Sequence, residues 1–125
     1  MKVAILADIH GNFDALERVS EEIEKLEDVM VLGDIIGYGA EPEDCVRWVV
    51  EKKAKVLLGN HEAACIGELP LSWFNPLALR ALLWTQKRLS SFSIRFIRSL
   101  PPVISDFLQA LWVHGSPRQP TEEYI

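Results

Sequence analysis

The fold is decided by three stretches that share one pattern: VMVLGD at residues 29–34, KVAILADIHGN at residues 2–12 and VLLGNHE at residues 56–62. Each begins with a short apolar run and turns polar at a Gly, Asp or Asn. Runs of this length suit strands that are covered on both faces, as they are in a parallel sheet. The polar residues that follow mark the turns where the strands end.

Helical patterns connect these three strands. The first connection has apolar side chains at helical spacing, and either Asn12 or Asp14 can cap its start; the apolar positions are Leu16, Val19, Ile23 and Leu26. The second connection begins at Pro42, a favourable first helical residue, and extends to about residue 53. Strands that alternate with helices in this way predict an α/β fold with a parallel core sheet, flanking helices and right-handed crossovers.

The rest of the chain predicts a helical region and then a hairpin. Residues 62–102 have helical composition, and residues 103–104 and 108–113 are predicted to form two strands around Asp106. There is no internal repeat, low-complexity tract or linker. We therefore expect residues 1–125 to form a single domain.

Composition limits the classes of function. The 125 residues are 49% hydrophobic, which is enough for one globular core, and carry a formal net charge of −5 at pH 7. Nonspecific binding to nucleic acid or to an anionic membrane requires clustered Lys and Arg, so the negative balance argues against both. Acidic substrates would need a local positive charge, such as a metal ion.

The sequence also predicts a cytoplasmic protein. Cys45 and Cys65 are far apart and lack C-x-x-C spacing, which favours reduced, structural thiols. The first apolar run is too short for a signal peptide, and no stretch approaches a membrane span of about 20 residues.

Polar side chains that can bind metal ions follow the predicted strands. Ligands bind beyond the carboxyl ends of strands in parallel sheets, where several loops meet. Taken singly, each of these residues could be an ordinary turn residue. It is their common placement at one edge that predicts a site, and that placement involves all three histidines of the chain; the set is Asp8, His10, Asp34, Asn60, His61 and His114.

These donors are oxygen and imidazole without thiolate, which suits divalent cations such as Mn²⁺, Fe²⁺ or Zn²⁺. Their number exceeds what one tetrahedral zinc ion needs, so we expect two divalent metal ions. A pair of ions bridged by a carboxylate can hold a phosphate ester and generate hydroxide at neutral pH. The alternative of a nucleotide-binding domain without metal is weaker, because the G-x-G-x-x-G pattern is absent.

On these residues the sequence resembles the calcineurin-like metallophosphoesterases, whose blocks are D-x-H, G-D-x-x, G-N-H-[DE], a later histidine after a strand, and G-H-x-H. Four of the five are present, as Asp8-Ile9-His10, Gly33-Asp34, Gly59-Asn60-His61-Glu62 and His114. The residues around these four blocks resemble those of a bacterial and archaeal branch of the family. The resemblance covers the whole chain and implies the first half of an αββα sandwich.

The resemblance also implies a role for each site residue. Asp8 and His10 would bind the first metal ion, and Asp34 would bridge both ions. Asn60 and His114 would bind the second ion. His61 would not be a ligand; it would be the catalytic residue that stabilises the transition state or protonates the leaving oxygen.

Two departures from the family pattern matter. Protein phosphatases of the superfamily have G-D-x-x-D-R-G, but Gly37 and Tyr38 stand at the second Asp and the Arg, which argues against a protein phosphatase and leaves open what orients His61. The final G-H-x-H block is also missing, because the chain has no fourth histidine. We therefore expect a domain truncated before its last metal-binding block.

Two functions remain open at this stage. The first is a metal-dependent phosphoesterase that hydrolyses phosphate mono- or diesters, with a small phosphate ester or a nucleotide as substrate. The second is a catalytically inactive interaction or regulatory module that needs a second chain or the missing half. In either case a homo-oligomer or a companion chain could cover the sheet where that half is absent.

Overall fold

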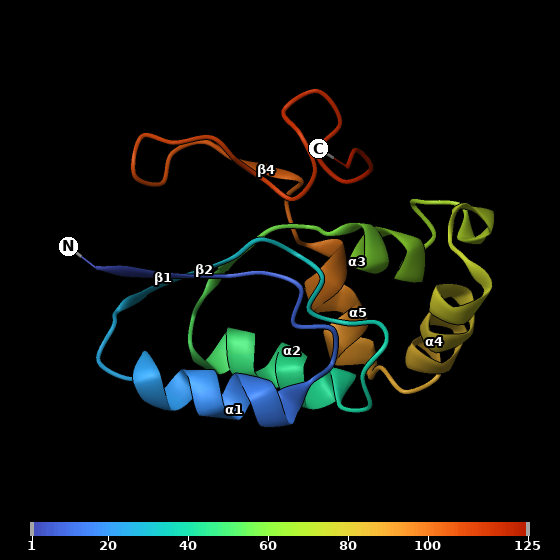
Figure 1. The fold of residues 1–125 in the computed structure, drawn as a ribbon, viewed down its shortest axis with the longest axis horizontal. Helices are drawn as coiled ribbons and strands as arrows, with labels where there is room; N and C mark the ends of the chain where they lie inside the picture. Colours follow the sequence, from blue (N-terminus) through green and yellow to red (C-terminus); the bar gives the residue numbers. More distant parts are fainter. Residues whose placement is uncertain (1, 125) are drawn as a thin grey trace.

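The computed structural model describes residues 2–124 (Figure 1). Strands and helices alternate through the first half of the chain, a helical region follows, and two short strands come last. The elements in chain order are β1 (Val3–Leu6), α1 (Phe13–Glu22), β2 (Asp28–Val31), α2 (Pro42–Glu51), β3 (Lys55–Val56), α3 (Asn60–Cys65), a 3-10 turn (Leu71–Trp73), α4 (Pro76–Gln86), α5 (Ser91–Arg98), β4 (Val103–Ile104) and β5 (Trp112–Val113).

The central sheet has the order β1-β2-β3, and both strand pairs are parallel. This confirms the predicted α/β fold with a parallel core sheet. The third strand is shorter than expected, because only Lys55 and Val56 pair with β2. The backbone N–H of Leu57 still donates to Val31, at 2.9 Å, but that of Leu58 donates to Pro101, which lies outside the sheet.

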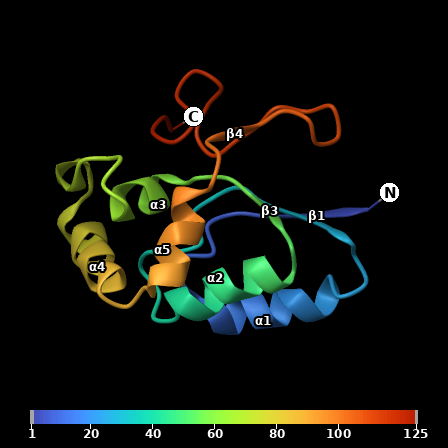
Figure 2. The same ribbon diagram turned by 180° about the vertical axis from the view of Figure 1, so that it is seen from behind.

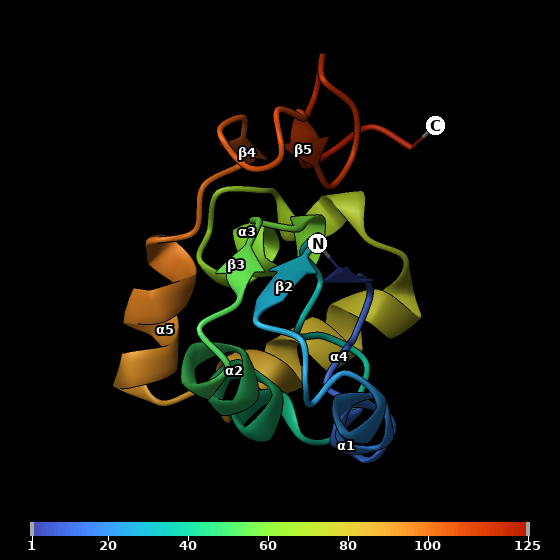
Figure 3. The ribbon, with the colours of Figure 1, turned by 90° about the vertical axis from the view of Figure 1, so that its left-hand side faces the viewer.

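Helices α1 and α2 lie together on one face of the sheet, and the C-terminal segment lies on the opposite side (Figures 1 and 3). Seen from behind, α3 and α4 lie beyond the carboxyl ends of the strands (Figure 2). The buried core between these layers includes Met30, Val31 and Val46, none of which has solvent exposure. The sheet edge that carries the polar residues is thus left open between α3 and the C-terminal segment.

Helix α1 is shorter than its apolar spacing predicted. The side chain of Asn12, not Asp14, caps it by accepting a hydrogen bond from the backbone N–H of Ala15 at 3.1 Å. The helix ends at Glu22, and Leu26 belongs to a tight turn in which its N–H donates to the carbonyl of Ile23 at 3.0 Å. Apolar spacing continues through that turn, which is why it extended the prediction.

The helical region begins earlier than predicted, at Asn60, so Asn60, His61 and Glu62 occupy the first turn of α3. Strands β4 and β5 pair antiparallel, as expected for the hairpin. The prediction that its second strand begins at Leu108 is wrong. Leu108 and Gln109 have φ values of 55° and 53°, and a left-handed backbone cannot continue a strand.

Cys45 and Cys65 are both free and buried, as predicted for structural thiols. Burial raises the pKa of Cys45 to about 12 and that of Cys65 to about 11, with nearby carboxylates adding to each effect. Both side chains therefore remain neutral thiols that pack in the core. Across residues 2–124, no helix has the length and apolar character needed to cross a membrane.

Candidate metal centre

All six predicted site residues line one open cavity of about 560 Å³. Asp8 and His10 follow β1, Asp34 follows β2, and His114 follows β5. Asn60 and His61 begin α3, directly after the loop that leaves β3. The fold therefore gathers side chains from four connections at one edge: three follow strands of the parallel sheet, as its topology predicted, and the fourth follows the antiparallel hairpin.

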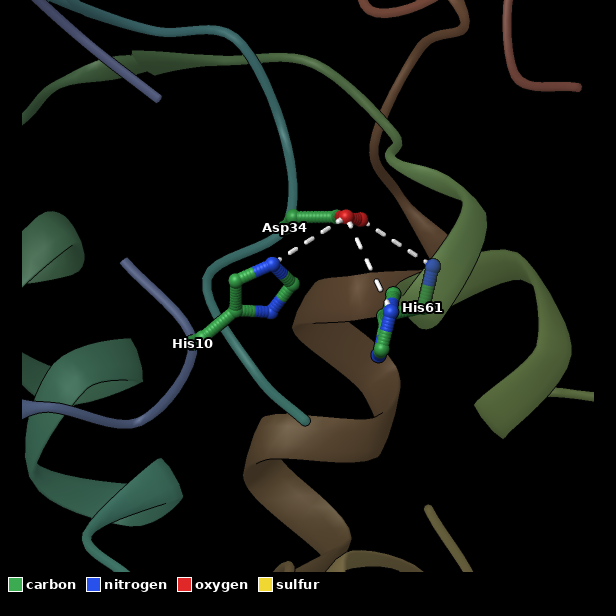
Figure 4. A group of neighbouring side chains, drawn as sticks. All are labelled: His10, Asp34 and His61. Atoms are coloured by element: carbon green, nitrogen blue, oxygen red, sulfur yellow. Dashed lines mark hydrogen bonds and ion pairs between the residues drawn. The ribbon is translucent and has the colours of Figure 1, made fainter. Parts of the chain in front are cut away.

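Asp34 is the centre of this group (Figure 4). Its Oδ2 lies 3.6 Å from Nε2 of His10, 3.5 Å from Nε2 of His114 and 4.0 Å from Nε2 of His61. Its Oδ1 accepts a hydrogen bond from the backbone N–H of His61 at 3.0 Å. Two groups with metal-ligand spacing share this carboxylate: His10, Asp34 and His61, and Asp8, Asp34 and His114.

Unusual backbone conformations point these side chains toward the edge. Asp8, His10 and Asp34 have φ values of 54°, 49° and 54°, a region that non-glycine residues rarely adopt. Backbone hydrogen bonds join the two loops, since the N–H of His10 donates to Asp34 at 2.9 Å and that of Gly11 donates to Ile35 at 2.7 Å. Strained residues of this kind persist where surrounding contacts hold them, and they cluster at functional sites.

Two histidines direct the same nitrogen toward Asp34. Nδ1 of His10 lies 3.0 Å from the carbonyl of Ile36, and Nδ1 of His114 lies 2.6 Å from that of Leu32. Because a carbonyl oxygen only accepts, Nδ1 must carry the proton in each ring. The lone pair on Nε2 then faces the carboxylate, which is the tautomer that a metal-binding histidine adopts.

The environment of Asn60 fits a cation. When the side-chain oxygen of Asn60 points toward the site, that oxygen faces only other acceptors, including Nε2 of His114 at 2.9 Å. Turned over, its NH₂ group would donate to that nitrogen at 2.9 Å and to both carboxylate oxygens of Asp34 at 3.2 and 2.9 Å. A metal ion among these atoms would satisfy all the acceptors at once, so the residues present fit the metal that the donor set predicts.

Burial controls the electrostatics of the site. It raises the pKa of Asp34 to about 7, and Asp8 adds to the effect, while the N–H of His61 opposes it. Burial, with smaller contributions from His10 and His114, lowers the pKa of His61 to about 4. A buried carboxylate is costly to charge without a partner, and a bound cation is such a partner.

Sequence analysis did not single out Glu62, which has no solvent exposure. Its carboxylate accepts backbone hydrogen bonds from Asp34 at 2.7 Å, Gly59 at 3.0 Å and Ile36 at 3.0 Å. It therefore ties the loop after β2 to the start of α3. The sequence does place an acidic residue at the end of the block Gly59-Asn60-His61-Glu62. The sequence alone, however, does not show which groups this carboxylate contacts.

The structure also shows how His61 is oriented. Across residues 2–124, no hydrogen-bond partner is found for its Nδ1, which is buried. The imidazole is held by aromatic neighbours, with ring centroids 4.6 Å away at His10, 5.0 Å at Tyr38 and 5.2 Å at Phe74. A Cβ atom on Gly37 would lie only 2.1 Å from Nδ1, so a glycine is needed there to let the ring sit in place.

This contact predicts that Gly37→Ala will be strongly destabilising. Gly67→Ala is a matched control, because Gly37 and Gly67 have φ values of 88° and 84°, but a Cβ on Gly67 would meet nothing within 4 Å. We expect Gly67→Ala to lower the free energy of unfolding by about 1 kcal/mol, which is backbone strain alone. Gly37→Ala should cost roughly 1–3 kcal/mol more, because His61 must move. Urea denaturation measures both, and equal losses would contradict the contact.

Comparisons with known proteins identify relatives of this chain. The family model for calcineurin-like phosphoesterases matches residues 1–121. The uncharacterised protein MJ0912 of Methanocaldococcus jannaschii is 32% identical over 123 residues, which are 94% of this chain and 51% of that protein. A symmetrical bis(5'-nucleosyl)-tetraphosphatase of Actinobacillus pleuropneumoniae is 31% identical over 55% of this chain and 27% of its own length.

Solved structures are also similar. A metallophosphoesterase from Sphaerobacter thermophilus has a TM-score of 0.85 and 41% identity, over 100% of this chain and 51% of that one. The protein PH1004 from Pyrococcus horikoshii has a TM-score of 0.87 and 25% identity, over 98% of this chain and 58% of that one. This chain thus spans about half the length of MJ0912 and of the Sphaerobacter protein. The family model, the M. jannaschii relative and the shared fold together show that the chain belongs to the calcineurin-like phosphoesterase family.

Proposed function

We propose that this chain carries the site of a phosphoesterase that uses two divalent metal ions to hydrolyse phosphate mono- or diesters. The observation that carries the proposal is the buried carboxylate of Asp34, whose Oδ2 lies 3.6 Å from Nε2 of His10 and 3.5 Å from Nε2 of His114, the two histidines that hold Nδ1 on a carbonyl. A carboxylate between two cations neutralises part of the charge of each, which allows the ions to lie close together. The cavity above this carboxylate is open enough to admit a phosphate ester.

In this proposal Asp8 and His10 would hold the first ion, Asn60 and His114 would hold the second, and the carboxylate of Asp34 would serve both; Oδ1 of Asp8 lies 4.0 Å from Nε2 of His10. The ring orientation of both ligand histidines supports the assignment, because each offers Nε2 to the site and holds Nδ1 on a carbonyl. The amide oxygen of Asn60 approaches Nε2 of His114 at 2.9 Å, which supports a shared ion for that pair. We expect Mn²⁺, Fe²⁺ or Zn²⁺, since the donors are oxygen and imidazole.

When bound, the two ions supply electrophilic assistance to the phosphate and lower the pKa of water so that hydroxide is available near neutral pH. The protein contributes the shape and the proton chemistry around them. The buried carboxylate of Glu62 keeps the loop that carries Asp34 in place. Nε2 of His61 lies 4.0 Å from Oδ2 of Asp34, and because burial lowers the pKa of this ring to about 4, it is neutral near neutral pH and can donate a hydrogen bond to a phosphoryl oxygen.

Small phosphate esters and nucleotides are the substrates we propose. The A. pleuropneumoniae relative, which is named a bis(5'-nucleosyl)-tetraphosphatase, supports the nucleotide class at the level of family likeness. The sequence gives independent support against phosphoprotein substrates, because Gly37 and Tyr38 stand where protein phosphatases have Asp and Arg.

His61→Ala tests the proposed catalytic role. We expect the rate of bis(p-nitrophenyl) phosphate hydrolysis with Mn²⁺ to fall by about a hundredfold or more, which is typical for the loss of a hydrogen-bond donor to the transition state. Metal content, measured by native mass spectrometry, should be unchanged because His61 is not proposed as a ligand. If His61→Ala lost its metal, the ligand assignment would be wrong. If the parent chain showed full metal occupancy but no rate, the inactive interaction module would be favoured for this chain.

A further inference from the structure

Tyr38 stands between two clefts that meet beside the candidate metal centre. The inner cleft is the 560 Å³ cavity that contains Asp34, Asn60, His61 and His114. The outer cleft has a volume of about 520 Å³ and is lined by residues 9, 11–12 and 39–41. Both clefts share Asp8, His10 and Tyr38, so a group bound near Asp8 and His10 can extend into either one.

The position of Tyr38 is fixed by its neighbours. Its φ of 62° is unusual for a tyrosine. The next residue, Gly39, donates its N–H to the carbonyl of His10 at 2.8 Å, and a Cβ there would lie 2.2 Å from that oxygen. The tyrosine ring meets the edge of His10 at a centroid distance of 5.0 Å and an interplanar angle of 80°. The backbone of Tyr38 is therefore fixed beside His10, and its ring forms a partition between the two clefts.

Core packing does not account for this residue, because 48% of its surface is exposed. An aromatic ring held rigidly with an open face is a surface on which bases and aryl groups stack. The ring contacts both His10 and His61, so a group stacked on it would be attached close to the reacting phosphate.

The charged residues that line the two clefts indicate which class of phosphate ester they can accept. Among the residues that the structure describes, no Lys or Arg lines either cleft, whereas Glu41 and Glu122 do; Glu123 also lines the inner cleft, but its carboxylate is paired with Arg118. Such walls disfavour the extra negative charge of a phosphomonoester or a polyphosphate and tolerate the single charge of a phosphodiester. A phosphodiester also has two organic groups, one for each cleft, and a monoester would leave one cleft empty.

We propose that Tyr38 determines specificity for phosphodiesters with aromatic or nucleoside groups, by stacking on a group that lies in one of the two clefts. This inference rests on the proposed function and deepens it.

Three esters with the same p-nitrophenolate leaving group test the proposal: bis(p-nitrophenyl) phosphate, methyl p-nitrophenyl phosphate and p-nitrophenyl phosphate. Tyr38→Ala should raise the KM for the bis-aryl diester about tenfold, the loss of one stacking contact, and leave the KM for the methyl diester nearly unchanged. Tyr38→Phe should retain the parent KM, and Trp84→Ala, which removes an exposed aromatic ring outside both clefts, is the control. Equal effects on both diesters, or a parent preference for the monoester, would overturn the proposal.

Binding without turnover separates this inference from the proposed function. Calorimetry on the Mn²⁺-loaded chain compares diphenyl phosphate with dimethyl phosphate, and we expect the first to bind about tenfold more tightly, a difference that Tyr38→Ala removes and Tyr38→Phe keeps. If no ester is hydrolysed but this difference is found, the proposed function fails and the role of Tyr38 stands. If hydrolysis is found but the two esters bind alike, the role of Tyr38 fails and the proposed function stands.

Discussion

Asp34→Asn is expected to abolish the binding of two metal ions, whereas Asn60→Ala should weaken only one. Asp34 is buried, and its carboxylate belongs to both groups of potential ligands. The amide that replaces it has nearly the same shape but no charge, so both cations lose a buried counter-ion. Breaking a buried charge pair costs about 4 kcal/mol, so we expect a decrease in metal affinity of about a thousandfold.

Asn60→Ala removes a neutral ligand, and the expected loss is therefore smaller. Native mass spectrometry with and without chelator counts the ions, and a metal titration by calorimetry gives the affinities. Asp106→Asn makes the same chemical change at an exposed position and serves as the control. Equal affinities for Asp34→Asn and Asn60→Ala would contradict the bridging role of Asp34.

Glu62→Ala is expected to be the most destabilising single substitution at this site. The carboxylate is fully buried and is the acceptor for three backbone N–H groups, from Asp34, Ile36 and Gly59. Its removal leaves these donors without their partner in the interior. Each such group costs about 1–3 kcal/mol, so the free energy of unfolding should fall by roughly 3–6 kcal/mol. That loss is a large part of the stability of a domain of this size.

Thermal unfolding followed by circular dichroism measures this effect, and a fall in Tm of roughly 15 °C or more is expected. Glu62→Gln should have an intermediate effect, because its oxygen still accepts but its NH₂ group faces a donor. Glu68→Ala removes an exposed carboxylate a few residues away and should change Tm by little. A Glu62→Ala protein as stable as Glu68→Ala would show that the three hydrogen bonds contribute little.

Much of the fold could be predicted from the sequence because strands and crossover helices leave local patterns. The apolar runs that end at Asp8, Asp34 and Asn60 predicted a parallel sheet, which is confirmed. Element ends were predicted less well, as at Leu26 and Leu108, because apolar residues also occur in turns and only hydrogen bonding and backbone angles show where an element stops.

The grouping of Asp8, His10 and Asp34 at one edge follows from the sequence by itself, because the parallel strands β1 and β2 place their carboxyl ends together whatever the details of packing. Tertiary structure alone decided how the loops meet there: the three backbone N–H groups that donate to the carboxylate of Glu62, the close approach of Gly37 to His61, and the partition formed by Tyr38. The physical reason is the sequence distance over which each signal acts. Periodicity records which face of an element is buried, whereas contacts between loops depend on atoms brought together from distant parts of the chain.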